Sequence, residues 1–349
     1  MATIVDVARR ANVAISTVSN ILNGTKYVSD EVTEKVMRAV EELNYEIDPV
    51  ARNMKSARSH NIGVVIANSS RIFFSSVLRS ILESAAGLGY TVMTFDSSDT
   101  FEWEKKYITM MCQNRFDGII LDSVAEMDDE KYFRWLAGLT YRNKRIYVAS
   151  LERDLSRYGI DSVTPDNYAG AQAVVRHLAG CGCSRLLHLA GPMNSTMAEE
   201  RARGFCDAAA ECGAQAARVA IGDFSPRSGY DLALEAFGGG RPAGYDAVFA
   251  ANDQMAVGAL KALEKLGLRV PQDVRVAGFD NTFVASLIEP ALTTVQVSGQ
   301  ALGGEAMRLL AARIEQPDRP AECRWLDAGL VVRTSTDPFA GKDAEFLPW

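Results

Sequence analysis

The chain of 349 residues lacks the features that would place it in a membrane or build a metal centre. No apolar run approaches the ~18 residues that a membrane-spanning helix needs. Only three histidines are present, so no metal-binding constellation can be assembled from them. The six cysteines are scattered, and the pair Cys181 and Cys183 is too tight and too isolated for a zinc site. We therefore expect no membrane segment, no metal and no cofactor.

Signals for export and for catalysis are missing as well. A helical pattern begins within the first three residues, which leaves no room for a secretory signal peptide. We expect a cytoplasmic protein with reduced thiols, because disulfides form in oxidising compartments. No nucleophile has a base partner, and no glycine-rich loop is placed to hold a phosphate. The sequence therefore argues against an enzyme.

Positive charge is not in excess. The formal net charge is −7, and residues 1–60 carry eight Lys or Arg against eight Asp or Glu, a balance of zero. DNA binding would therefore have to depend on where charges lie and not on their sum. Most of these acids fall on or after a third predicted helix, which can face away from a duplex. We expect a moderate number of phosphate contacts per subunit and a moderate dependence of affinity on salt.

Two short helical patterns lie back to back in residues 3–24. Thr3 can cap the first, with Asp6 at capping-box spacing, and residues 11–13 break it. The second runs from about Ile15 to Leu22, with short hydrogen-bonding side chains on its outer face. Such a pair of helices fits a major groove as a helix-turn-helix, although an ordinary helical hairpin with a solvated face has the same pattern. A third helix, capped by Ser29, follows.

The segments DVARRANVAISTVSNILNG, YVSDEVTEKV, ELNY and VARNMK resemble the headpiece and hinge of the lactose-repressor and purine-repressor family. The resemblance covers about the first 58 residues nearly continuously. Two departures are Ala14, where relatives have a capping serine, and Asn20, where many have arginine. The DNA-binding positions that we expect are Thr3, Ile15, Ser16, Thr17, Ser19, Asn20, Asn23, Tyr27, Ala51, Met54 and Lys55.

The hinge is predicted to form a short helix that starts at Asp48 and Pro49 and ends at about Ser56. A helix this short is unstable alone in water, so we expect it to fold only between its dimer twin and the minor groove. The resemblance implies that Met54 takes the place of a leucine that wedges into the central base step.

From Ile62 onward, short β-branched runs alternate with longer amphipathic helices. Strands are predicted at 62–67, 90–95, 118–121 and 145–150, and a second series begins at 162–164. This alternation predicts parallel sheets covered by helices on both faces. We place the division between two doubly wound subdomains at the polar segment 158–164. The layout resembles the type I periplasmic sugar-binding proteins, which implies that strand 291–297 and helix 298–314 cross back to the first subdomain.

The predicted fold class is therefore an N-terminal all-α helix-turn-helix headpiece followed by an α/β effector domain of two subdomains, like the type I periplasmic binding proteins. The predicted segments are the headpiece 1–46, the hinge helix and linker 47–60, the effector and dimerisation domain 61–336, and a tail 337–349. The two subdomains are predicted as 61–161 with 291–320, and 162–290 with 321–336. No heptads follow Thr336, so a tetramerising coiled coil is not supported.

Candidate ligand residues follow the predicted strands, where ligands of such sheets collect. Acids, an amide and arginines that converge with aromatic rings are typical of a sugar pocket. The segments GPMNSTMAEERARGF, GDFSPRSGY, ANDQMAVGAL and GFDN also resemble those that hold the inducer in the lactose repressor family. Singly, these residues could instead be turn residues, helix caps or ion-pair partners. The set is Arg71, Phe73, Glu152, Arg201, Phe224, Asn252 and Asp280.

We predict a homodimeric, ligand-responsive transcriptional regulator that binds a pseudo-palindromic, double-stranded operator. A repressor of a carbohydrate-use operon, released by a sugar or sugar derivative, fits best. Arg71 would add a second cation to Arg201, which leaves open an anionic ligand such as a sugar phosphate or sugar acid. A co-repressor is also left open. The nearest other class is a sugar-binding receptor, against which the fused headpiece argues.

Overall fold

The computed structural model describes residues 2–23, 26–45, 58–238 and 244–340. The chain divides into two compact units, Met1–Ser59 and His60–Trp349. Within the described ranges, no helix is long and apolar enough to cross a bilayer. In the same ranges, no three His, Cys, Asp or Glu side chains are grouped so as to hold a metal ion.

The first unit contains three helices, α1 (Ile4–Ala11), α2 (Ile15–Asn23) and α3 (Asp30–Glu42). The predicted capping box is present, since Thr3 accepts from the Asp6 amide and Asp6 accepts from the Thr3 amide. Asn12, in the left-handed region at φ 53°, ends α1. Ser29 precedes α3, but its side chain makes no capping hydrogen bond, contrary to the prediction. A small apolar core holds the helices together, formed by Val7, Ala8, Val18, Val36 and Ala39.

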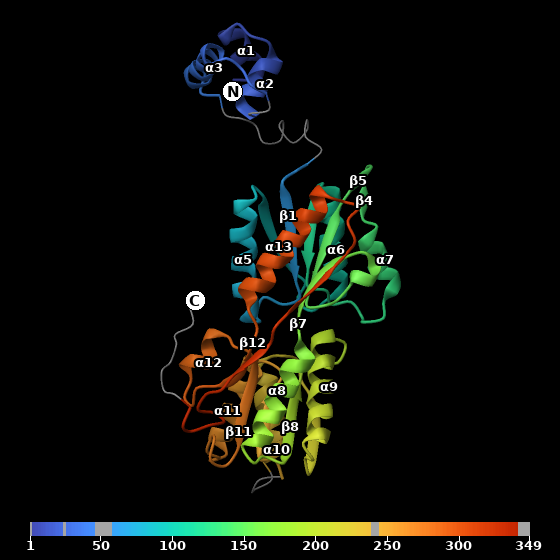
Figure 1. Ribbon diagram of the computed structural model, residues 1–349, viewed down its shortest axis with the longest axis vertical. Helices are drawn as coiled ribbons and strands as arrows, with labels where there is room; N and C mark the ends of the chain where they lie inside the picture. The colour runs from blue at the N-terminus through green and yellow to red at the C-terminus, as the bar shows by residue number, and fades with distance from the viewer. Residues whose placement is uncertain (1, 24–25, 46–57, 239–243, 341–349) are drawn as a thin grey trace. The chain divides into compact units, whose positions relative to one another are not determined.

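The second unit is built on two six-stranded sheets (Figure 1). The first sheet has the order β13 (Cys323–Leu326), β7 (Asp161–Pro165), β6 (Tyr147–Leu151), β3 (Gly118–Leu121), β1 (Asn61–Ile66), β2 (Thr91–Asp96). The second has the order β14 (Gly329–Val331), β12 (Thr293–Gln296), β11 (Arg275–Asp280), β10 (Ala247–Ala250), β8 (Arg185–Ala190), β9 (Ala216–Ile221). All pairings within these sheets are parallel except that of β12 with β14. The predicted parallel architecture is therefore confirmed.

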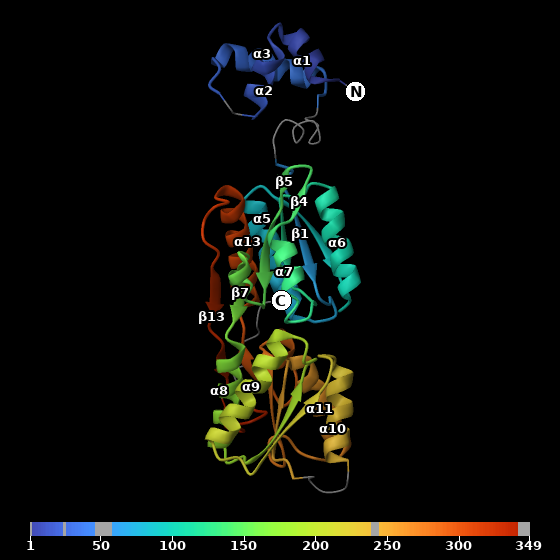
Figure 2. The ribbon, with the colours of Figure 1, turned by 90° about the vertical axis from the view of Figure 1, so that its right-hand side faces the viewer.

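Helices cover both faces of each sheet (Figure 2). The first subdomain, which is the first sheet with its helices, includes α5 (Phe73–Gly87), α6 (Phe101–Gln113), α7 (Glu130–Ala137) and α13 (Gly299–Glu315), with a 3-10 turn at Ser156–Tyr158. The second subdomain includes α8 (Asn167–Gly180), α9 (Thr196–Glu211), α10 (Pro226–Phe237), α11 (Asp253–Lys265) and α12 (Phe283–Leu287). The predicted strand 118–121 is fully buried between these layers, whereas β2, predicted at 90–95, is largely exposed at the edge of its sheet.

The sheet membership of three strands corrects the predicted subdomain boundaries. Strand β12 pairs with β11 in the second sheet, so 291–297 does not cross back, and only α13 does. Strand β7, predicted to open the second series, pairs with β6 in the first sheet. Strand β13 pairs with β7, also in the first sheet, while β14 belongs to the second. The chain therefore crosses between subdomains after β7, after β12 and after β13.

Helix α13 is held on the first subdomain by close backbone packing. It packs against α5 and against strands β6 and β7. A Cβ atom added at Gly303 would lie 2.3 Å from the carbonyl oxygen of Val77, so only glycine permits this approach of α13 to α5. The last crossing helix is thus fixed to the first subdomain, although its preceding strand belongs to the second.

A small antiparallel hairpin precedes β6 and was not predicted. It consists of β4 (Thr140–Tyr141) and β5 (Lys144–Arg145), which pair Thr140 with Arg145 and Tyr141 with Lys144. The sequence predicts one strand over 145–150, whereas Arg145 belongs to the hairpin and the buried strand begins at Tyr147. A two-residue turn at Arg142 and Asn143, both with positive φ, connects the two strands.

Candidate functional site

All seven predicted ligand residues line one cavity of the second unit. The cavity has a volume of about 20 Å³, which is room for about one water molecule. It lies where strands of both sheets end, as the rule for parallel sheets predicts. Its lining consists of Arg71, Phe73, Phe74, Glu152, Met197, Arg201, Phe224, Asn252 and Asp280. A wider groove of about 470 Å³ shares Phe73 and Asp280 with it.

Arg201 is the most deeply buried charged residue of this cavity, with 1% of its surface exposed. Its Nε donates to Asn167 Oδ1 at 2.9 Å, and its Nη1 donates to the Ala251 carbonyl at 2.5 Å. Its Nη2 lies 3.4 Å from Asp280 Oδ1. The guanidinium also covers the Phe279 ring at 3.7 Å from its centroid. A buried cation is tolerated because it is hydrogen-bonded and paired on every side.

Arg71 enters the cavity from the loop that follows β1. Its guanidinium lies 4.9 Å from the centroid of the Phe224 ring and forms an ion pair with Asp99. The Phe224 ring in turn lies against Gly191, where an added Cβ would be 2.2 Å from the ring. Arg71 is thus a cleft residue, and its side chain lies over one face of the Phe224 ring.

The two subdomains are joined across the cleft at the start of α11. The amide of Ile72 donates to Gln254 Oε1 at 2.9 Å, and Gln254 Nε2 donates to the Ser70 carbonyl at 3.2 Å. The neighbouring Asn252 caps α11 by accepting from the Met255 amide, and it donates to the Phe224 carbonyl at 3.1 Å. The capping role considered for Asn252 is therefore real, and the same side chain lines the cavity.

Carboxylates around the cavity have raised pKa values. Burial, together with the nearby charges of Asp122 and Asp280, raises the pKa of Glu152 to about 8, although Arg201 and Arg71 act to lower it. Burial also raises the pKa values of Asp122 and Asp280 to about 6. Within the described residues no hydrogen bond to the Glu152 carboxyl group is found, although it is buried. Burial without a hydrogen-bond partner thus favours the protonated form of the Glu152 carboxyl group.

Left-handed backbone is concentrated at the same place. Glu152, Phe224 and Asp280 have φ values of 60°, 68° and 100°, in a region that side chains other than glycine rarely adopt. Conformations of this kind have an energetic cost and persist where surrounding structure enforces them, which happens often at ligand sites. Three cavity residues with this conformation support a functional reading of the cavity.

The predicted DNA-binding positions lie mainly on and around α2. Ile15 and Ser16 are exposed at the start of α2, and Thr17, Ser19 and Asn20 are half-buried along it. Tyr27 is 91% exposed, whereas the Thr3 hydroxyl donates to Asp6 within the capping box. The described residues do not include the side chain of Asn23, or the hinge positions Ala51, Met54 and Lys55.

The sequence reasoning missed three residues of this region. Phe74 and Met197 line the cavity; Phe74 is next to the predicted Phe73, and Met197 lies in the segment GPMNSTMAEERARGF. Asp122 directly follows β3 and acts electrostatically on Glu152. The rule that selected Glu152 and Asp280, a carboxylate after a buried strand, would also have selected Asp122.

Comparison with known protein families gives two matches in this chain. Residues 3–48 match bacterial regulatory proteins of the lacI family. Residues 175–336 match the periplasmic binding protein-like domain. The first match covers the helix-turn-helix and the second covers most of the cavity residues described above.

Individual relatives match nearly the whole chain. The ribose operon repressor of Halalkalibacterium halodurans is 33% identical over 337 residues, which are 96% of this chain and 97% of that protein. The HTH-type transcriptional repressor PurR of Edwardsiella ictaluri is 34% identical over 339 residues, with the same coverage of 96% and 97%. The lac repressor dimer bound to operator and the anti-inducer ONPF has 29% identity and a TM-score of 0.84, covering 96% of this chain and 99% of that one.

The raised pKa of Glu152 predicts a pH-dependent stability. Between its unfolded value near 4.5 and its folded value of about 8, only the folded chain holds this proton. The free energy of unfolding therefore falls as pH rises through this window, by up to ~1.4 kcal/mol per pH unit for one such group. Denaturant unfolding at pH 5, 6.5 and 8 measures this slope. We expect Glu152→Gln to flatten it and the exposed Glu102→Gln to leave it unchanged; an unchanged slope in Glu152→Gln would contradict the assignment.

Proposed function

The chain belongs to the lacI family of bacterial regulatory proteins, and from this premise we propose that it represses a carbohydrate-use operon and is released by a sugar-type inducer. Members of the family are DNA-binding transcriptional regulators and not enzymes. The helix-turn-helix of the first unit binds an operator, and the cavity of the second unit binds the effector.

The observation that carries the sugar assignment is the chemistry of the cavity. The carboxyl group of Glu152, whose pKa is raised by burial, and that of Asp280 offer hydrogen-bond donors and acceptors to the hydroxyls of a polyol. The Phe224 ring offers an apolar face of the kind that packs against a sugar ring. A relative that is 33% identical is a ribose operon repressor, which agrees with this class of ligand.

The effector acts, we propose, by changing the cleft between the two subdomains. A cavity of about 20 Å³ cannot hold a sugar, so binding requires Arg71 to leave the Phe224 ring. The hydrogen bonds of Gln254 to Ser70 and Ile72 bridge the same cleft and would be rearranged with it. A ligand that binds one arrangement of the cleft more tightly than the other by a few kcal/mol shifts the population toward that arrangement.

A thermal-shift screen against sugars, sugar acids and sugar phosphates identifies the effector class. We then expect Asp280→Asn to weaken effector affinity by about 2–5 kcal/mol, because the variant disturbs a buried, hydrogen-bonded network. Operator affinity, measured by fluorescence anisotropy, should stay near the wild-type value. The exposed Asp231→Asn serves as control. A normal effector dose-response in Asp280→Asn would remove this residue from the site.

A second candidate ligand is an anion, and the position of Arg71 favours it. Its guanidinium and that of Arg201 both line the cavity, and a phosphate or carboxylate could replace Asp99 as the partner of Arg71. For a sugar acid or sugar phosphate, Arg71→Gln should reduce affinity at least tenfold. For a neutral sugar, the same variant should retain or raise affinity, because the side chain that covers Phe224 is removed. Calorimetric titration of the wild-type chain and of Arg71→Gln with the ligand from the screen separates the two cases.

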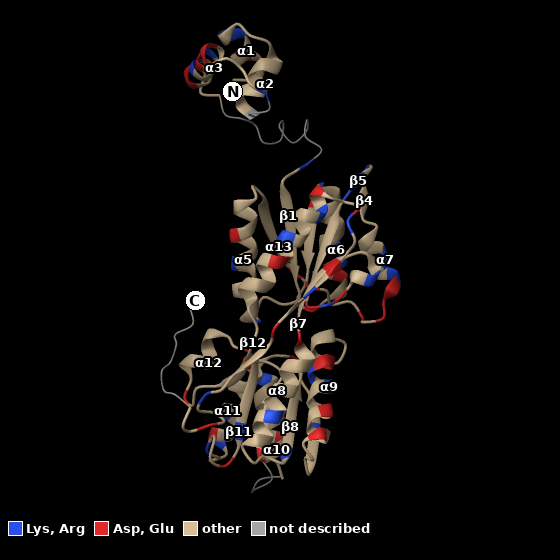
Figure 3. Cartoon of the chain, in the orientation of Figure 1, with Lys and Arg blue, Asp and Glu red and all other residues tan. Residues whose placement is uncertain are grey.

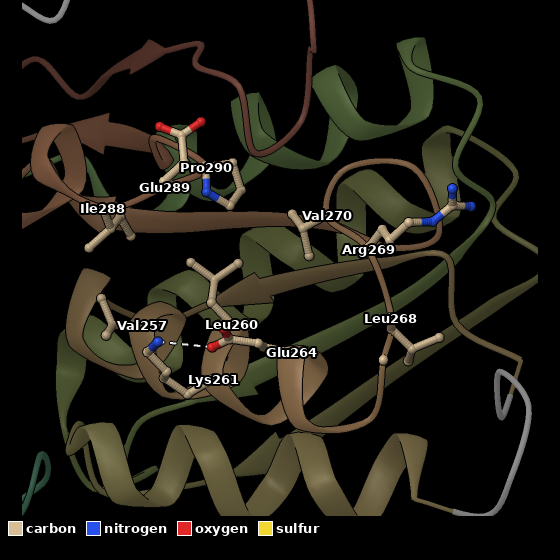
Figure 4. A pocket seen from close by; sticks show the side chains of 11 residues that line it. Val257, Leu260, Lys261, Glu264, Leu268, Arg269, Val270, Ile288, Glu289 and Pro290 are labelled. Atoms are coloured by element: carbon tan, nitrogen blue, oxygen red, sulfur yellow. Dashed lines mark hydrogen bonds and ion pairs between the residues drawn. The ribbon is translucent and has the colours of Figure 1, made fainter.

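We also propose that the protein acts as a homodimer. The single helix-turn-helix per chain offers few base contacts, and two-fold symmetric operators fit two-fold proteins. A groove of about 550 Å³ in the second subdomain has an apolar lining that includes Val257, Leu260 and Ile288. In Figure 4, Val257 and Leu260 of α11 face the segment with Ile288 and Pro290, and the Lys261–Glu264 pair lies at the edge. An apolar groove with a charged rim is typical of a protein interface.

Sedimentation measures the oligomeric state directly. We expect the wild-type chain to sediment as a dimer and Leu260→Glu to sediment as a monomer with much weaker operator binding, because a charge would be placed in an apolar interface. Lys261→Glu at the edge of the groove controls for added negative charge. A wild-type monomer that binds a single half-site tightly would contradict the dimer.

A further inference from the structure

The β4–β5 hairpin of the first subdomain carries three cations in four residues. Its tip reads Arg142, Asn143, Lys144 and Arg145. The two turn residues have φ values of 47° and 63°, which suit asparagine or glycine but are costly for arginine. Local backbone preference therefore does not explain an arginine at position 142. Figure 3 shows Lys and Arg gathered along this hairpin.

The arginines of this hairpin lack the acidic partners that neutralise several other exposed arginines of the unit. Arg176 pairs with Glu211, Arg218 with Glu235, and Arg227 with Asp231. By contrast, Arg142 lies over the Tyr141 ring, and Arg145 lies over Tyr147 and donates to the Ala137 carbonyl. Within the described residues neither forms an ion pair. Their charge is therefore available to an external anion.

One buried carboxylate fixes the hairpin beside the point where the chain enters this unit. Asp117, 2% exposed at its side chain, accepts from the His60 amide at 2.8 Å and from Lys144 Nζ at 2.5 Å. Its own amide donates to the carbonyl of Asn61, the first residue of β1. Lys144 also donates to the carbonyl of Arg115, another exposed arginine with a positive φ. The hairpin and residue 60 thus belong to the same end of the first sheet.

In the described part of the first unit, most cations are paired with acids. Arg10 pairs with Glu42, Lys35 with Glu31, and Arg38 with Glu34. The connecting segment 46–59 can span at most about 50 Å even when fully extended. A duplex bound by the first unit is therefore linked, by at most this length of chain, to the end of the first sheet that carries residue 60 and the hairpin.

We propose that Arg142 and Arg145 form a second DNA-contacting surface, which binds phosphates of the duplex that flanks the operator. The inference rests on operator binding by the first unit and adds a contact from the second. Two stacked guanidinium groups without acidic partners match the charge and geometry of phosphate oxygens. The segment after α13 carries the exposed acids Glu315 and Asp318, so the proposed surface is limited to the hairpin.

The test measures the salt dependence of DNA affinity with the full chain. An operator is first selected from a random duplex pool with the wild-type protein and is placed in a 60-base-pair and a 20-base-pair duplex. We expect Arg142→Ala/Arg145→Ala to lower the slope of log K against log salt by about 0.9 per arginine on the long duplex, nearly 2 per subunit. Between 50 and 200 mM salt this corresponds to about tenfold per subunit. The short duplex should show no change.

Two control variants make the result specific. Arg218→Ala/Arg227→Ala removes the same charge from paired arginines of the second subdomain and should leave both slopes unchanged. Arg142→Lys/Arg145→Lys keeps the charge and should restore most of the slope. Thermal melting confirms that each variant folds.

The inference fails if the hairpin variant has the wild-type slope on the long duplex. It fails in the same way if the hairpin binds an acidic protein and not DNA, because the slope is then also unchanged. An equal fall on both duplexes overturns the flanking position. If the wild-type chain selects no duplex at all, operator binding itself fails, and this outcome is distinct from the others.

Discussion

The buried guanidinium of Arg201 sets the geometry on which the ligand cavity depends. Its partners come from α8, from the residue after β10 and from the end of β11, so one charge fixes three chain segments. Loss of one partner from such a buried pair costs about 3–5 kcal/mol, because an uncompensated charge remains. The part of the cavity that belongs to the second subdomain is therefore built before any ligand arrives.

The part that belongs to the first subdomain is held more weakly. Arg71 reaches Phe224 by a cation–π contact, and the link through Gln254 consists of two hydrogen bonds. Contacts of these kinds contribute about 1 kcal/mol each. The second subdomain thus presents a rigid side of the cavity, and weak contacts connect the first subdomain to it. Such an arrangement is suited to control by a ligand, because a modest binding energy is enough to change the position of one subdomain relative to the other. The carboxyl groups of Glu152 and Asp122 also belong to the first subdomain, and the charge of Asp122 helps to raise the pKa of Glu152.

The sequence predicted the cavity better than it predicted the sheets. The rule that ligands gather where parallel strands end selected Glu152 and Asp280 from local pattern alone, and the structure brings both to one cavity. The sheet to which β7, β12 or β13 belongs has no such local signal. A strand of four or five residues has the same apolar pattern in either sheet, and its partners are set by pairings far along the chain. The β4–β5 hairpin was missed for a related reason, because its turn uses Arg142 where the usual signal is glycine or asparagine.

In this protein, the groups that recognise DNA bases and the cations that attract DNA phosphates lie in different places. The helix-turn-helix surface offers hydroxyl and amide groups such as Ser16 and Asn20, while the cations of α3 are paired with acids on the same helix. Hydroxyls and amides discriminate between bases, but they add little to long-range attraction, which depends on unpaired charge. A negatively charged chain that binds DNA must therefore hold its free cations in a few fixed places. The hairpin at the end of the first sheet is one such place, anchored through Lys144 to the buried carboxylate of Asp117. The same carboxylate holds the first residues of β1, so the structure that fixes these cations also fixes where the DNA-binding unit is attached.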